Sequence, residues 1–127
     1  MRRRHFLAAA APAVLAAACA PQAAMQTISV FFTADSATLD AEAQAVVRAA
    51  ADRAKSTTGP IVVVGFAGPA GGAAYNRALS EQRAQHVADL LISSGLPRER
   101  VRVVARGPVP FESVATESRR VEIRAGG

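Results

Sequence analysis

The segment that most constrains how this chain folds is Gly65–Ala84, GFAGPAGGAAYNRALSEQRA, together with the apolar run directly before it. That run, Ile61–Phe66, is nearly uninterrupted, which is typical of a central strand buried on both faces. The glycine-rich loop at 67–72 separates it from a helical pattern that closes at Gly95 and Pro97. The side chains expected on the buried face of this helix are Leu79, Val87, Leu90 and Leu91. The chain therefore contains a buried strand, a glycine-rich loop and a long helix in succession.

A shorter amphipathic helix is predicted before this unit. Asp40 is placed to begin the helix, and residues 57–60, Thr-Thr-Gly-Pro, end it. The apolar positions that recur at helical spacing between them are Ala43, Val46, Val47, Ala50 and Ala54. Because alanine supplies much of the apolar content, we expect close helix packing rather than a large cavity.

Further strands complete the prediction. Thr27–Phe32 is β-branched and aromatic, and Val101–Ala105 follows the long helix. A rigid turn at 107–110, Gly-Pro-Val-Pro, separates that strand from the last one, Arg120–Arg124, in which apolar and charged residues alternate. The order β-α-β-α-β-β predicts an α+β two-layer sandwich with two helices on one face of a sheet.

These blocks, in this order, resemble the C-terminal-like domain of outer membrane protein A (OmpA). The family's signature runs roughly G-h-x-D-x-x-G-x-x-x-Y-N-x-x-L-S-x-x-R-A, where h is apolar. The residues that match it include Gly65, Tyr75, Asn76, Leu79, Ser80, Arg83 and Ala84. Phe32–Leu39 and Ser118–Ile123 are similar to the family's entry and closing blocks, although Ser118 replaces an Asn. The resemblance spans about residues 28–123 and implies the OmpA-like fold.

The resemblance also implies a binding site for peptidoglycan, the polymer of the bacterial cell wall. The family's pocket holds the diaminopimelate of a stem peptide, which carries an ammonium and a carboxylate on one carbon. Arg83 matches the family's arginine, whose planar fork suits the carboxylate. Asn76 lies about two helical turns earlier on the same face and is expected to assist. The family's Asp, which accepts from the ammonium, is replaced here by Gly68.

This replacement leaves two interpretations open. In the first, wall binding persists but is weakened roughly ten- to a hundred-fold by the loss of a charge-assisted hydrogen bond. Asp35, on the turn after the first strand, is then a candidate substitute for the missing acid. In the second, the domain is a degenerate structural or protein-interaction module, in which Arg83 merely holds the fold and Tyr75 and Leu79 are core residues. Ser80 is expected at the surface or as a cap.

Residues 1–19 have the anatomy of an export signal, with a basic start, an apolar run and then Cys19. The segment Arg3-Arg4-His5-Phe6-Leu7 resembles a twin-arginine export motif, and an ordinary secretory signal is the alternative. Cys19 follows a sequence that resembles a lipobox, which predicts an acylated lipoprotein; cleavage at an Ala-x-Ala site to give a soluble protein is the alternative. We therefore expect an export signal at 1–19, a short tether at 20–26 and an OmpA-like domain at 27–127.

These features predict a palmitate-bearing outer-membrane lipoprotein facing the periplasm, with a soluble periplasmic protein as the alternative. Peptidoglycan and the membrane are its expected partners, together with other envelope proteins. The formal charge of +5 falls to +2 without the three leader arginines, which argues against nucleic acid. Two histidines and one cysteine argue against a metal cluster, and no nucleotide-binding or serine-hydrolase motif is present. We expect no cofactor and no enzymatic activity.

Overall fold

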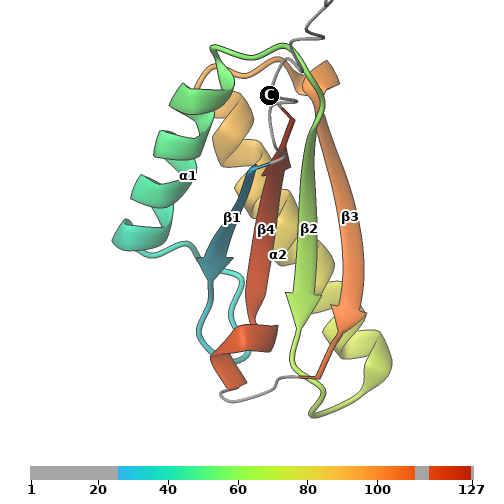
Figure 1. The fold of residues 1–127 in the computed structure, drawn as a ribbon. Helices are drawn as coiled ribbons and strands as arrows, with labels where there is room; N and C mark the ends of the chain where they lie inside the picture. The colour runs from blue at the N-terminus through green and yellow to red at the C-terminus, as the bar shows by residue number, and fades with distance from the viewer. Residues whose placement is uncertain (1–25, 111–114, 127) are drawn as a thin grey trace, which may run out of the picture.

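The computed structural model describes residues 26–110 and 115–126, which form a four-stranded sheet and two helices (Figure 1). The predicted export signal, Cys19 and most of the predicted tether lie outside the described residues. In chain order the elements are β1 (Gln26–Phe31), α1 (Ala41–Ala54), β2 (Ile61–Ala67), α2 (Ala73–Ser93), β3 (Val101–Pro108) and β4 (Arg120–Ala125). Short 3-10 turns at Arg98–Arg100 and Ala115–Ser118 precede β3 and β4.

The strands lie in the order β1-β4-β2-β3, so the last strand occupies the interior of the sheet. β4 runs antiparallel to both of its neighbours, whereas β2 and β3 are parallel and are joined by the crossover helix α2. Because β4 is reversed, its first residue lies at the same end of the sheet as the last residues of β1 and β2. The predicted α+β sandwich is confirmed, and this strand order determines which loops meet.

The hydrophobic core lies between the helices and one face of the sheet. From the strands it contains Val30, Ile61, Val63, Val121 and Ile123, and from the helices Val47, Val87 and Leu91 together with the alanines of both. Small side chains let the layers approach closely, and Gly65 is the extreme case. A Cβ built on Gly65 would lie 2.0 Å from the backbone oxygen of Ser80 in α2, so no side chain fits between β2 and this helix.

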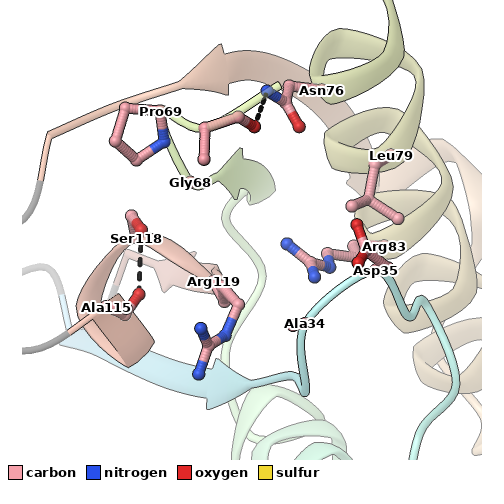
Figure 2. A pocket seen from close by; sticks show the side chains of 11 residues that line it. Ala34, Asp35, Gly68, Pro69, Asn76, Leu79, Arg83, Ala115, Ser118 and Arg119 are labelled. Carbon is pink, nitrogen blue, oxygen red and sulfur yellow. Dashed lines mark hydrogen bonds between the residues drawn. The ribbon is translucent and has the colours of Figure 1, made fainter. Parts of the chain in front are cut away.

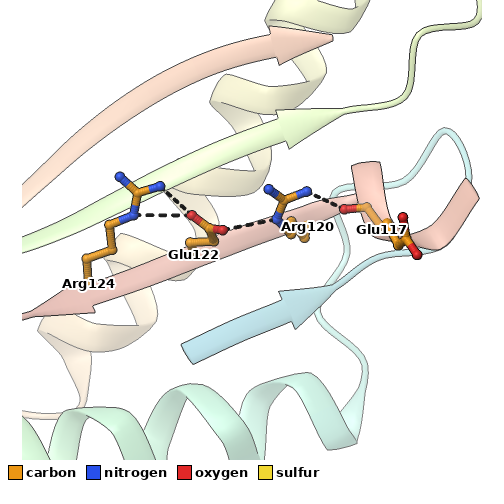
Figure 3. Close-up of polar contacts among 4 residues, drawn as sticks. All are labelled: Glu117, Arg120, Glu122 and Arg124. Atoms are coloured by element: carbon orange, nitrogen blue, oxygen red, sulfur yellow. Dashed lines mark hydrogen bonds and ion pairs between the residues drawn. The ribbon is translucent and has the colours of Figure 1, made fainter. Parts of the chain in front are cut away.

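In the described part of the chain no helix covers the other face of the sheet, and charged side chains shield it instead (Figure 3). Glu122 accepts from Arg120 Nε at 3.2 Å and from Arg124 Nε at 3.2 Å, and Arg120 also donates to the backbone oxygen of Glu117. The Arg120 guanidinium lies 4.1 Å from the centroid of the Phe66 ring. Burial raises the pKa of Glu122, but hydrogen bonds from the two arginines outweigh it, and the pKa lies below its usual range.

Two local predictions need correction. β3 extends to Pro108, because its parallel pairing with β2 continues beyond the irregularity at Gly65/Phe66, so the first half of the expected turn is strand. Val46 is exposed, because the buried face of α1 consists of Ala43, Val47, Ala50, Ala51 and Ala54. The expected helix start is confirmed, since Asp40 Oδ1 accepts from the backbone N–H of Ala43 at 2.8 Å.

Candidate functional site

A small cavity of about 180 Å³ lies at the end of the sheet where β1 and β2 finish and β4 begins (Figure 2). The residues that line it are Ala34, Asp35, Gly68, Pro69, Ala70, Asn76, Leu79, Arg83, Ala115, Ser118 and Arg119. They come from the loops after β1 and β2, the first half of α2 and the 3-10 turn before β4. The structure thus brings Gly68, Asn76 and Arg83 to one cavity, together with Asp35, while their role in binding stays a prediction.

Arg83 is fully buried and is fixed by the ends of two strands. Its Nε donates to Ser36 O at 2.7 Å, Nη1 to Phe66 O at 3.2 Å and Nη2 to Thr33 O at 3.0 Å. These bonds use three of the five N–H groups of a guanidinium, which leaves two for a ligand. Burial lowers the pKa of Arg83, the charge of Arg119 lowers it further, and Tyr75 and Asp35 oppose the shift. The arginine is therefore both a structural brace and a rigid donor.

Arg119 is a second cation on the cavity wall. Its Nε donates to Phe32 O at 3.3 Å and its Nη2 to Thr116 Oγ1 at 3.1 Å. In the sequence, Arg119 is only part of the block Ser118–Ile123 that resembles the family's closing block. The sequence shows that Arg119 directly precedes a strand. It does not show that this strand, β4, lies between β1 and β2, which is what brings Arg119 to the ends of both neighbours.

Asp35 is the carboxylate of the cavity. It adopts a left-handed conformation with φ 53°, and its Oδ1 accepts from the Tyr75 hydroxyl at 3.2 Å. Desolvation raises the pKa of Tyr75, and the charge of Asp35 and this hydrogen bond raise it further. Tyr75 is 52% exposed, so the second interpretation was wrong to place it in the core, whereas Leu79 is buried as that interpretation had it. With Asp35, Arg83 and Arg119 on its walls, the cavity offers one carboxylate and two guanidinium groups.

Asn76 is buried, and its Nδ2 donates to Ala70 O at 2.7 Å. This bond ties the glycine-rich loop to the first turn of α2, as Figure 2 shows. The amide N–H₂ is therefore engaged with the loop, and Asn76 shapes the cavity wall through the loop.

Gly68 stands opposite Arg83 across the cavity (Figure 2). The positive-φ glycines of the described residues are Gly71, Gly95 and Gly107, and Gly68 is not among them. A Cβ on Gly68 would meet only Ser118 Oγ, at 3.3 Å. Position 68 therefore accepts a side chain if the Ser118 hydroxyl shifts by a few tenths of an ångström.

Ser80 corrects another expectation. Instead of lying at the surface it is fully buried, because α2 packs tightly over β2 and β3 at this point. Its Oγ donates to Arg77 O at 2.7 Å and accepts from the backbone N–H of Gly107 at 3.1 Å. Ser80 thus fastens α2 to β3 and takes no part in the cavity.

The described residues contain no cluster of three or more His, Cys, Asp or Glu side chains able to hold a metal ion. Within the same residues, no helix is long and apolar enough to span a membrane.

Residues 31–124 match the sequence family described as the OmpA family. The chain belongs to the OmpA family. Outer membrane protein A of Citrobacter freundii is 38% identical over 99 residues, which cover 72% of this chain and 42% of that protein. The chain thus spans less than half the length of the OmpA relatives it matches.

Solved structures of OmpA-like domains agree with the fold. The peptidoglycan-associated lipoprotein of Burkholderia pseudomallei is 26% identical with a TM-score of 0.69, covering 76% of this chain and 89% of that one. The cell wall anchor of the type VI secretion system (T6SS) of Pseudomonas aeruginosa is 25% identical with a TM-score of 0.66, covering 84% and 88%. The family resemblance and the fold predicted from the sequence are both confirmed.

Proposed function

We propose that this OmpA-family domain attaches a membrane non-covalently to peptidoglycan by binding stem-peptide diaminopimelate in the cavity around Arg83. The observation that carries the proposal is a buried arginine with two spare donors in the same cavity as a carboxylate, Asp35. The names of two structural relatives, a peptidoglycan-associated lipoprotein and a cell wall anchor, support this class of function. The role is one of binding, with no catalytic step.

Asp35 supplies the acceptor that the family places at position 68. A diaminopimelate end carries opposite charges on one carbon, so its site needs a cation and an anion within a few ångströms of each other. Arg83 and Arg119 take the carboxylate by charge-assisted hydrogen bonds, and Asp35 takes the ammonium. The hydroxyl of Tyr75 holds Asp35 at the cavity, which limits the entropy lost when the ligand binds.

Asp35→Asn is the sharpest test of this proposal. Arg83 is a poor probe, because its removal leaves three backbone carbonyls without their donor and endangers the fold. Asp35 is exposed, and an amide of the same size keeps the Tyr75 contact. All core residues lie between Ile28 and Ala125, so the chain from Ala20 onward keeps the whole core and serves for the measurement.

In co-sedimentation with isolated peptidoglycan, Asp35→Asn is expected to weaken binding at least about ten-fold, as the loss of one charge-assisted hydrogen bond. Glu81→Gln, on the exposed side of α2, is the matched control and is expected to bind like the parent. Equal binding by all three proteins would remove Asp35 from the site. Absence of binding by a folded parent would refute the wall-binding function.

That last outcome would favour the second candidate, a structural or protein-interaction domain of the same fold. The specific observation in its favour is Gly68, which leaves the family's acid position without a carboxylate.

We further propose that residues 1–19 direct export and that Cys19 is acylated, which places the domain in the periplasm under the outer membrane. Cys19→Ser removes the site of acylation. It is expected to release the protein from membranes, because stable anchoring needs two or more acyl chains. The measurement is membrane fractionation with radiolabelled palmitate. A Cys19→Ser protein that stays in the membrane fraction at high salt, or that still incorporates palmitate, would argue against the anchor and leave the cavity proposal untouched.

A further inference from the structure

The end of the domain opposite the cavity carries the excess positive charge. The sheet register places the start of β1 beside the end of β4, since Gln26 pairs with Ala125, and Ile61 pairs with both Ala125 and Val101. Both helices also finish at this end (Figure 1). The basic residues that gather there are Arg53, Lys55, Arg98, Arg100, Arg102 and Arg124, which we call the basic pole.

Two acids, Asp52 and Glu99, lie among the six cations of the basic pole, and a third, Glu122, pairs with Arg124. The remaining described residues contain six Arg and six Asp or Glu side chains. The net positive charge of the described residues therefore lies at one end. Such separation produces a field that attracts an extended anionic surface.

Local structural needs explain only part of this pole. Arg100 donates to Ala54 O, Gly59 O and Thr57 Oγ1, Arg124 pairs with Glu122, and Lys55 pairs with Asp52 at 3.1 Å. Arg53 and Lys55 also lie at the C-terminus of α1, where cations are favourable.

Arg53, Arg98 and Arg102 differ from these braced cations. They are exposed, and their side chains make no hydrogen bond or ion pair within residues 26–110 and 115–126. Three free guanidinium groups are therefore available to an external anionic partner.

The larger cavity of the domain, about 470 Å³, opens at the same pole. Ile28, Ala50, Ala54, Ile123 and Ala125 supply apolar walls, and Arg53 lies on its lining. Apolar surface beside exposed cations is the combination by which proteins bind at a lipid interface.

The path of the chain points to the same partner. The described chain begins at Gln26, within the basic pole and seven residues after Cys19. Seven extended residues reach about 25 Å at most. Helix α2, which runs from the Arg83 cavity to the basic pole, has 21 residues and is therefore about 31 Å long. A domain anchored at Cys19 thus has its basic pole near the lipid surface and its cavity directed away.

We propose that the basic pole binds the anionic headgroups of a lipid bilayer and thereby orients the Arg83 cavity toward the cell wall. The orientation rests on the anchor proposed above, whereas lipid binding by the pole does not depend on wall binding. Arg53, Arg98 and Arg102 make the contact with lipid phosphates, and the braced cations add to the field.

The test measures binding of the chain from Ala20 onward to phosphatidylcholine vesicles with rising fractions of phosphatidylglycerol. Each arginine near an anionic bilayer contributes about five-fold in affinity, so the triple variant Arg53→Gln, Arg98→Gln and Arg102→Gln is expected to bind about a hundred-fold more weakly. Binding by the parent is expected to require phosphatidylglycerol. It is also expected to fall when the salt concentration rises from about 0.02 M to about 0.5 M, because the Debye screening length then contracts roughly five-fold.

The matched control is Arg48→Gln, Arg77→Gln and Arg106→Gln, which removes the same charge from exposed positions outside the pole. The affinity of this control for the vesicles is expected to fall only a few-fold, because of the change in net charge alone. Equal losses in the two triple variants, or no vesicle binding by the parent, would overturn the proposal. So would a pole variant that loses peptidoglycan but keeps vesicles, since the pole would then belong to the wall. Asp35→Asn is expected to bind vesicles normally, which separates this result from the fate of the wall-binding proposal.

Discussion

At the scale of single residues, the cavity departs from the pattern of its family at Gly68 and Ser118, and its carboxylate lies at another position. The family's acid is Gly68 here, but Asp35 lies on the same cavity and is held by Tyr75. We propose that this carboxylate, 33 positions earlier in the chain, replaces the missing one. The side chain of the buried Arg83 is held at the cavity by three hydrogen bonds to backbone carbonyls.

Gly68→Asp tests this substitution from the other direction. Since Gly68 has no positive φ and its Cβ would meet only the Ser118 hydroxyl, the change is expected to leave the fold intact. It is expected to raise the affinity for peptidoglycan about ten- to a hundred-fold, and to restore binding in the Asp35→Asn background. Co-sedimentation is the measurement, with Gly68→Asn as the uncharged control. If Asn were as effective as Asp, the gain would come from packing or polarity and not from the carboxylate.

At the scale of elements, the contact between β2 and α2 positions the cavity. Gly65 and Ser80 bring the strand and helix close, and Ser80 also fastens the helix to β3 through Gly107. Any shift of α2 would move Arg83 and Asn76 together, because both lie on the same helix. The sequence indicated the strand, the loop and the helix, but not the closeness of their backbones.

Gly65→Ala is accordingly expected to be severe. The added Cβ would lie 2.0 Å from Ser80 O, and moving a helix backbone to relieve this contact costs at least about 1–3 kcal/mol. For a domain of this size the melting temperature would fall by roughly 10 °C or more. Thermal unfolding followed by circular dichroism measures the change. Gly59→Ala, whose Cβ would have its nearest neighbour at 3.7 Å, is the control and should melt at least as high as the parent; an equal loss at both sites would exclude the close approach to Ser80 O as the cause.

At the scale of the whole molecule, charge is distributed along the long axis and across the open face of the sheet. One end carries the Arg83 cavity and the other the basic pole, while the Glu122 network with Arg120 and Arg124 shields the face that the helices leave uncovered. The domain therefore has two chemically distinct ends joined by α2. This polarity is suited to a protein that bridges two envelope surfaces.

The Glu122 network predicts a pH dependence of stability. Because the arginine hydrogen bonds hold the pKa of Glu122 below its unfolded value, the carboxylate stabilises the fold above the unfolded pKa. That contribution is lost as the pH falls through the lower folded pKa. Glu122→Gln is expected to lower stability by about 1–2 kcal/mol at pH 7 and to differ little from the parent at pH 2. Urea unfolding of both proteins across this range measures it; a difference that stays constant with pH would exclude the charge as the cause.

The sequence by itself determined the order of elements, the burial of Ile61–Phe66 and the helix start at Asp40, because strand and helix periodicities and caps are local properties. Only the tertiary structure decided that Asp35, Arg83 and Arg119 share one cavity. These residues are 36 or more positions apart, and they meet because β4 returns to the interior of the sheet between β1 and β2. The burial of Ser80 and the gathering of the basic pole have the same origin. Pairing between strands that are distant in the sequence determines which ends of the strands and helices are neighbours, and no short-range pattern predicts it.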